Sequence, residues 1–279
     1  IGSGLVCSEM CIRDMHYPTY MALSFHNKNR LKGVSIRWYQ SGTYPLQSLN
    51  YTYNELISAE KDALIFTDAN WTLFASYLLQ YGKGLFNDKK VIFSALMLTP
   101  FSMNELTEEL GIPEFKDADP EFYKSKTPTM TFANEMKKRI EHIAKYTKRP
   151  IYISVSTNEA VKNLLKDHLY GEGLLMRYSS KPYDNLAVMR RNFENTYLLD
   201  YLYETFYPET LTDVCLDLKG VKMLSIYYVP AFKSLLQFYK ESGDVTHYDK
   251  LYSLLESIVK KADYYSDEVR ERYLKSINF

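Results

Sequence analysis

Short apolar runs alternate with amphipathic stretches over the first two-thirds of the chain. The runs have the length and apolar content of buried strands, whereas the stretches between them carry apolar residues at helical spacing. The predicted strands cover residues 63–67, 91–98, 151–155 and 174–178. Strands that alternate with helices in this way indicate βαβ units. We therefore expect an α/β fold with a mostly parallel, Rossmann-like sheet and flanking helices, in which the direction of the fourth strand is left open.

The helices between these strands are predicted from periodicity and from their first residues. Apolar side chains recur at helical spacing over residues 71–81, 132–143 and 161–169. Two capping boxes, Ser102 with Glu105 and Ser156 with Glu159, predict where helices begin, because the serine oxygen accepts a free backbone N–H and the glutamate reaches back. Residues 15–48 show no regular pattern, so no element is predicted there.

Beyond Pro182 the pattern is helical. The predicted helices cover residues 186–206, 221–240 and 246–260. Residues 241–244, Glu-Ser-Gly-Asp, form a short turn that predicts an antiparallel helix hairpin, and Pro230 should kink its first helix or divide it in two. The hairpin is tetratricopeptide-like, but no repeat at a period of about 34 residues accompanies it. The expected units are an α/β domain at residues 15–182 and an all-helical tail at residues 183–279.

The first residues are expected not to belong to the natural protein. Residues 5–14 resemble the translation of a sequencing adapter, with Cys7 standing where the adapter would give glycine. We therefore leave residues 1–14 out of the fold as an artefact and expect an environmental gene fragment whose upstream part is missing. Cys215 is then the single remaining cysteine, and we expect it to be a small packed hydrophobe.

Composition narrows the functional classes. Lys and Arg total 34, as do Asp and Glu, and this balance argues against nucleic acid as a partner. No apolar run approaches the roughly 18 residues of a membrane span. Tyrosine is abundant, with 26 copies, which would suit stacking on sugar rings; half-buried helix and strand faces are the favoured explanation. The histidines are scattered singly, so we expect no metal site.

Polar residues follow three of the predicted strands, where ligands of open α/β sheets gather. These candidate ligand-binding residues are Asp68, Asn70, Thr99, Ser156 and Asn158. Their oxygens suit a sugar or a phosphate, but the same residue types at the same positions are ordinary helix caps, which is the favoured role. Gly171-Glu-Gly173 lacks the third glycine of a dinucleotide fingerprint, so no cofactor is expected. No catalytic constellation is present in the sequence.

Several short motifs occur in the same order as in one family of membrane proteins. They are Ala63-Leu-Ile-Phe-Thr-Asp68-Ala-Asn70, Tyr77-Leu-Leu-Gln80 with Gly84, Asp88 and Val91, Arg149-Pro150-Ile-Tyr-Ile, and Tyr170-Gly-Glu172-Gly173-Leu174-Leu-Met-Arg177. Over roughly residues 50–205 their order and spacing resemble the soluble domain that follows the membrane helices of bacterial protein O-mannosyltransferase-like integral membrane glycosyltransferases. The chain departs from that pattern at Ala69, Trp71, Lys89 and Lys90.

The resemblance implies an accessory role rather than catalysis. In that family sugar transfer is assigned to the membrane-embedded part, which this chain does not contain. The expected function is a non-catalytic domain on the periplasmic side of the inner membrane, whose partners are the membrane-embedded part of the same protein and acceptor proteins. Two alternatives stay open: a free-standing α/β enzyme or binding protein for a sugar or phosphate at the strand ends, and a helical interaction module at residues 221–260.

Overall fold

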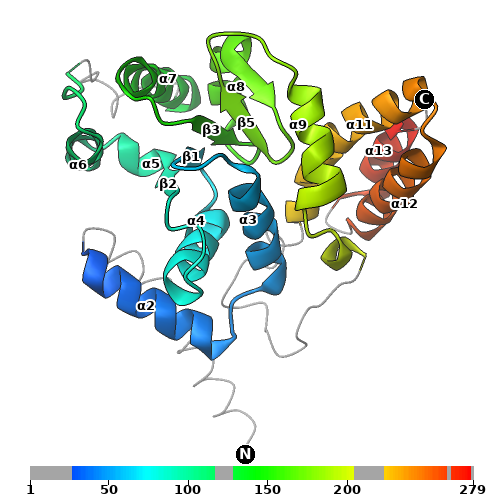
Figure 1. The fold of residues 1–279 in the computed structure, drawn as a ribbon, viewed down its shortest axis with the longest axis horizontal. Coiled ribbons are helices and arrows are strands. Elements are labelled where there is room, and N and C mark those ends of the chain that lie inside the picture. The colour runs from blue at the N-terminus through cyan, green and yellow to red at the C-terminus, as the bar shows by residue number, and fades with distance from the viewer. Residues whose placement is uncertain (1–26, 117–127, 204–222, 263–264, 278–279) are drawn as a thin grey trace, which may run out of the picture.

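The protein consists of a central sheet covered by helices, followed by a group of helices at one end (Figure 1). A computed structural model describes residues 27–116, 128–203, 223–262 and 265–277. The sheet unit contains α2 (Lys28–Ser41), α3 (Leu46–Ser58), β1 (Leu64–Thr67), α4 (Asn70–Tyr77), β2 (Lys90–Phe93), α5 (Ser94–Met97), α6 (Pro100–Leu110), α7 (Pro128–Tyr146), β3 (Ile151–Ser154), α8 (Glu159–Leu165), β4 (Leu169–Gly171) and β5 (Leu175–Tyr178). The later helices are α9 (Asn185–Arg191), α11 (Val229–Ser242), α12 (Val245–Lys261) and α13 (Asp267–Ile277).

The sheet is mixed, with the strand order β2-β1-β3-β5-β4. Strands β2, β1 and β3 are parallel, as expected from their βαβ spacing, whereas β5 runs antiparallel to β3 and β4 runs antiparallel to β5. The expectation of a mostly parallel sheet therefore holds for three neighbouring strands only. The predicted helix over 161–169 ends earlier than expected, and Leu169–Gly171 forms the additional strand β4.

A short connection explains why β4 and β5 are antiparallel. Only the loop Glu172-Gly173-Leu174 separates them, and a parallel pair would need a crossover of a dozen or more residues. Gly173 has φ = +124°, a conformation that side chains rarely adopt, and an added Cβ would collide with the hydroxyl of Tyr197. Gly173 is thus part of a hairpin turn.

Two predictions about the first part of the sheet unit need correction. The strand expected over 91–98 is divided into β2 and α5, because its partner β1 ends at Thr67, opposite Phe93, and the next residues find no strand to pair with. The region 15–48, expected to be irregular, contains α2 and the start of α3 within its described part. Leu31, Val34 and Trp38 of α2 pack against residues of α4 and the π-helical turn after it, at a spacing that was readable from the sequence.

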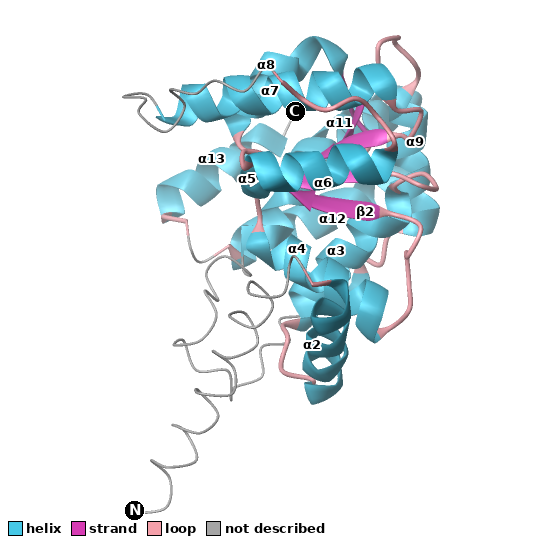
Figure 2. Cartoon of the chain, turned by 90° about the vertical axis from the view of Figure 1, so that its left-hand side faces the viewer, coloured by secondary structure: helices cyan, strands magenta, loops and turns pink. Residues whose placement is uncertain are grey.

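The two faces of the sheet have separate cores, as the alternation of side chains in a strand requires. On one face Leu64, Phe66 and Ile153 pack against α6, α7 and α8. On the other face Ile65 and Tyr152 pack against α3 and α4. Figure 2 shows the strands enclosed between helices.

The segment after Pro182 does not form the single helix predicted over 186–206. After α9 a π-helical turn covers Asn192–Thr196, the chain is extended at Tyr197, and a 3₁₀ turn covers Asp200–Leu202; residues 204–206 lie outside the described residues. Buried amides fix this interruption: the side-chain N–H of Asn192 donates to Glu172 O at 2.8 Å, and Leu198 N–H donates to Asn54 Oδ1 at 2.8 Å.

The helix hairpin is present as predicted, formed by α11 and α12. Gly243, with φ = +71°, ends α11, and Asp244 caps α12 by accepting from His247 N–H at 3.1 Å. Pro230 lies in the first turn of α11, directly after a 3₁₀ turn at Leu224–Tyr228, so it divides the predicted helix instead of kinking it. Helix α13 was not predicted.

One core joins the helical tail to the sheet unit. Tyr51 of α3 and Leu174 of the hairpin loop belong to the same buried cluster as Tyr228 and Phe232 of the tail. Within the described ranges, no helix has both the length and the apolarity of a bilayer span. Residues 1–14 and Cys215 lie outside the described residues.

Candidate functional site

The structure brings three of the five predicted site residues together at the carboxyl ends of β1 and β3. Asn158 N–H donates to Asp68 Oδ2 at 2.7 Å, and Ala160 N–H donates to Asn158 Oδ1 at 2.8 Å. Asn158 is therefore the N-cap of α8, and Asp68 holds the backbone of that cap. The capping box predicted at Ser156 is wrong by two positions, since α8 begins at Glu159.

Ser156 instead belongs to a chain of hydroxyl groups behind this edge. Its Oγ lies 2.8 Å from Ser154 Oγ and 3.4 Å from Thr67 Oγ1, which in turn lies 2.8 Å from Thr72 Oγ1. Each of these oxygens thus has a protein partner. One atom of this edge differs: Asp68 Oδ1 is buried and has no hydrogen-bond partner within the described part of the chain.

The other two predicted site residues lie apart from this group. Asn70 is exposed at the start of α4, and its side chain forms no hydrogen bond with the residues described. Thr99 follows α5 and caps α6, where its Oγ1 accepts from Ser102 N–H at 3.3 Å. The capping box predicted at Ser102 is therefore also displaced, because Pro100 already occupies the first turn of the helix.

A buried carboxyl group, missed in the sequence, lies beneath the same edge. Glu55 of α3 is 3% exposed, and its Oε1 lies 2.5 Å from Ser154 Oγ. Burial raises the pKa of Glu55 to about 8, against the opposing effect of the hydrogen bonds it accepts. Ser154 is fully buried, so no substrate reaches this pair, and we assign it a structural role. A helix predicted over α3 would have placed Glu55 on the same helix face as Tyr51 and Ser58. An acid on that face is the sequence signal of this buried carboxyl group.

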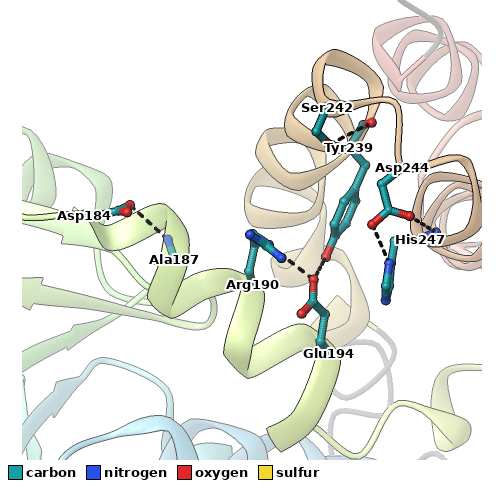
Figure 3. Close-up of polar contacts among 8 residues, drawn as sticks. All are labelled: Asp184, Ala187, Arg190, Glu194, Tyr239, Ser242, Asp244 and His247. Carbon is teal, nitrogen blue, oxygen red and sulfur yellow. Dashed lines mark hydrogen bonds and ion pairs between the residues drawn. The ribbon is translucent and has the colours of Figure 1, made fainter.

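A second polar cluster joins α9 and the turn after it to the hairpin of α11 and α12 (Figure 3). Glu194 accepts a hydrogen bond from the Tyr239 hydroxyl at 2.7 Å and pairs with Arg190 at 3.3 Å. On the other side of Tyr239, the ring of His247 stacks at 5.2 Å, and His247 Nδ1 lies 2.7 Å from Asp244 Oδ2. Burial raises the pKa of Tyr239, and the hydrogen bond to Glu194 raises it further.

This cluster resembles an acid–base relay, but each member has a packing role. Asp244 is the N-cap of α12, Tyr239 is fully buried in α11, and Arg190 lies 4.7 Å over the ring of Phe238. Its geometry holds α9 and the following turn against the hairpin. Among the residues described, no group of three His, Cys, Asp or Glu side chains is placed to hold a metal ion.

A hollow with a mixed lining lies between the sheet unit and the tail. It has a volume of about 680 Å³. Its walls come from α8, from β4 and β5, from the 3₁₀ turn at Leu224–Tyr228 with the start of α11, and from α13. One wall is polar: Glu159, Lys162 and Asn163 of α8 line it, together with Lys166 of the 3₁₀ turn that follows. The opposite wall includes Tyr227, Tyr265 and Tyr273.

This cavity was not predicted, because its walls come from segments far apart in the chain. The polar stripe of α8 was readable from its spacing of three and four residues, which places the side chains on one helix face. Nothing in the sequence indicates that this face lies opposite the tyrosines of the tail.

No protein-family model, no curated protein and no solved structure matches this chain.

Proposed function

We propose that this chain is a non-catalytic extramembrane domain of a membrane-bound protein glycosyltransferase, with an accessory or acceptor-presenting role on the periplasmic side of the inner membrane. The motifs of residues 50–205 suggest the family. The observation that carries the non-catalytic part is the use of the polar groups at the strand ends. Asp68 and Asn158 serve the N-terminus of α8 and Thr99 caps α6, so these three predicted site residues have structural roles, although Asp68 Oδ1 has no hydrogen-bond partner among the residues described.

The gene itself tests the first part of this proposal. In DNA that contains the gene, the reading frame upstream of the codon for His16 should encode several apolar segments of about 20 residues each, the length of a membrane helix. A signal peptide placed directly before this domain would contradict the proposal. So would transfer or hydrolysis of a nucleotide sugar or lipid-linked sugar by the purified chain alone.

A second candidate function, a binding protein for a sugar or phosphate at the strand ends, is favoured by the topology. The order β2-β1-β3 places β1 and β3 side by side, with α4 on one face of the sheet and α6 and α7 on the other. In Rossmann-like sheets this is the switch point at which ligands bind. The partnerless Asp68 Oδ1 lies there.

Calorimetric titration with inorganic phosphate and with mannose distinguishes the two functions. The accessory role predicts no saturable heat for either probe. Saturable binding that Asp68→Ala abolishes, in a variant as stable as the natural chain, would favour the binding protein.

A further inference from the structure

The cavity between α8 and the tail has walls of opposite character. Glu159, Lys162 and Asn163 of α8 form the polar wall with Lys166 of the next turn, which gives one negative and two positive side chains. The tail contributes apolar and aromatic residues to the lining, among them Ile226 and Tyr227. The cavity thus offers an excess of one positive charge along one side only. Such an arrangement suits a molecule that has an apolar body and an anionic end.

The two lysines differ in how they are held. Lys162 Nζ lies 2.8 Å from a carboxylate oxygen of Glu159 and donates to Val155 O at 2.8 Å, and its side chain is only 16% exposed. Lys166 is exposed, and no ion pair or hydrogen bond joins its ammonium group to the described residues. Lys166 is therefore the cation available to a ligand, with Lys162 fixed about one turn before it in α8.

The apolar part of the cavity is suited to a flexible partner. Three methionines line it: Met176 from β5, Met189 from α9 and Met223, which precedes the 3₁₀ turn at Leu224–Tyr228. Methionine side chains are unbranched and polarisable, and they adapt to irregular apolar groups. Gly171 of β4 also lines the cavity, and a Cβ added there would meet only the end of Met189, at 3.8 Å. The volume of about 680 Å³ falls within the range of roughly 300–1,000 Å³ typical of small-molecule sites.

We propose that this cavity binds a monocarboxylate with an extended apolar body, the chemistry of a medium-chain fatty acid. The carboxylate pairs with Lys166 at the mouth, and the apolar body lies between the methionines and the tyrosines of the tail. The inference does not depend on the proposed accessory role, since the cavity is formed within this chain.

Isothermal titration calorimetry with sodium decanoate, below its micellar concentration, tests the site. We expect one decanoate to bind per chain, with 1-decanol binding more weakly. Ser234→Trp places a large side chain at an exposed position of the lining and should weaken decanoate binding by at least about tenfold. Ser242→Trp is the matched control, an exposed serine at the other end of α11 that does not line the cavity, and it should bind as the natural chain does.

The charge is tested separately. Lys166→Gln should weaken decanoate binding about three- to fivefold, as expected for one partly solvated ion pair, and leave 1-decanol binding unchanged. Lys32→Gln, an exposed lysine of α2, should change neither. The proposal is overturned if decanoate binds with many sites per chain, if Ser234→Trp binds as tightly as Ser242→Trp, or if 1-decanol binds as tightly as decanoate. Absence of any saturable heat would overturn it equally.

Discussion

The edge at the ends of β1 and β3 and the junction between the sheet unit and the tail use polar side chains in different ways. At the strand ends, Asp68 and Asn158 serve backbone groups at the start of α8. At the junction, Asn54 bonds Leu198 and Tyr228, which lie 144 and 174 residues away in the chain. Polar residues at predictable positions therefore complete one helix. Those that join the two units, and Lys166 beside the cavity, are recognised only once the chain is folded.

The largest effect should come from Asn54. Its side-chain N–H groups donate to Leu198 O at 2.8 Å and to Tyr228 Oη at 2.7 Å, and its Oδ1 accepts from Leu198 N–H. Asn54→Ala removes these bonds and leaves part-buried backbone groups without partners. We expect a loss of about 4 kcal/mol in the free energy of unfolding, measured by urea denaturation. Asn70→Ala, at a predicted site residue that is exposed, should change it by less than about 0.5 kcal/mol. Equal losses for the two asparagines would contradict the comparison.

Glu55 should make stability depend on pH. Its pKa is raised to about 8 in the folded chain by burial, whereas in the unfolded chain it is near 4.5. The folded state therefore holds a proton that the unfolded state releases over this interval, so this stabilisation is present below about pH 4.5 and is lost as pH rises towards 8. Relative to Glu55→Gln, the natural chain should lose about 1 kcal/mol per pH unit between pH 5 and 8.

Chemical denaturation at several pH values measures this difference. Glu108→Gln, at an exposed glutamate of α6, should leave the pH dependence unchanged. If the natural chain and Glu55→Gln have parallel pH profiles, the carboxyl group is not held neutral by burial.

The sequence predicted well those features that depend on neighbouring residues. The strand at Ile151–Ser154 and the hairpin of α11 and α12 appear where apolar periodicity and the Gly243-Asp244 turn placed them. Candidate caps were found by residue type. Both predicted capping boxes, however, begin a few residues after or before the observed N-caps, Thr99 and Asn158.

Features that depend on distant residues could not be predicted in this way. The strand β2 ends at Phe93 because β1 ends opposite it, and the helix predicted over 186–206 is interrupted where buried amides of Asn54 and Asn192 bind the backbone. The environment of Glu55 and the cavity beside α8 depend in the same way on contacts between separate segments. Helix α2 is different, because the spacing of Leu31, Val34 and Trp38 indicates one helix face from the sequence alone.

A smaller effect is expected at the contact between α9 and the hairpin. Tyr239→Phe keeps the buried ring and its packing but removes the hydroxyl that donates to the Glu194 carboxylate at 2.7 Å. We expect a loss of about 2 kcal/mol in the free energy of unfolding, because the acceptor is charged. Tyr248→Phe is the matched control on α12, where the ring stacks on Tyr252 and the substitution should change stability by less than about 0.5 kcal/mol.

The smallest effect decides the role of the strand-end edge. Asp68→Ala removes the acceptor of Asn158 N–H, and Asn158→Ala removes the cap of Ala160 N–H. If both residues serve the start of α8, each substitution should lower the free energy of unfolding by about 1 kcal/mol, the usual contribution of an N-cap. The double variant should lose less than the sum of the two, because both substitutions act on one helix terminus. A ligand site would behave differently. If the Asp68 carboxylate serves only to bind a sugar or phosphate, its removal should leave the ligand-free protein as stable as before, or more stable. Unchanged stability in Asp68→Ala would therefore favour ligand binding over a structural role at this edge. It would also remove the contrast with the junction between the sheet unit and the tail.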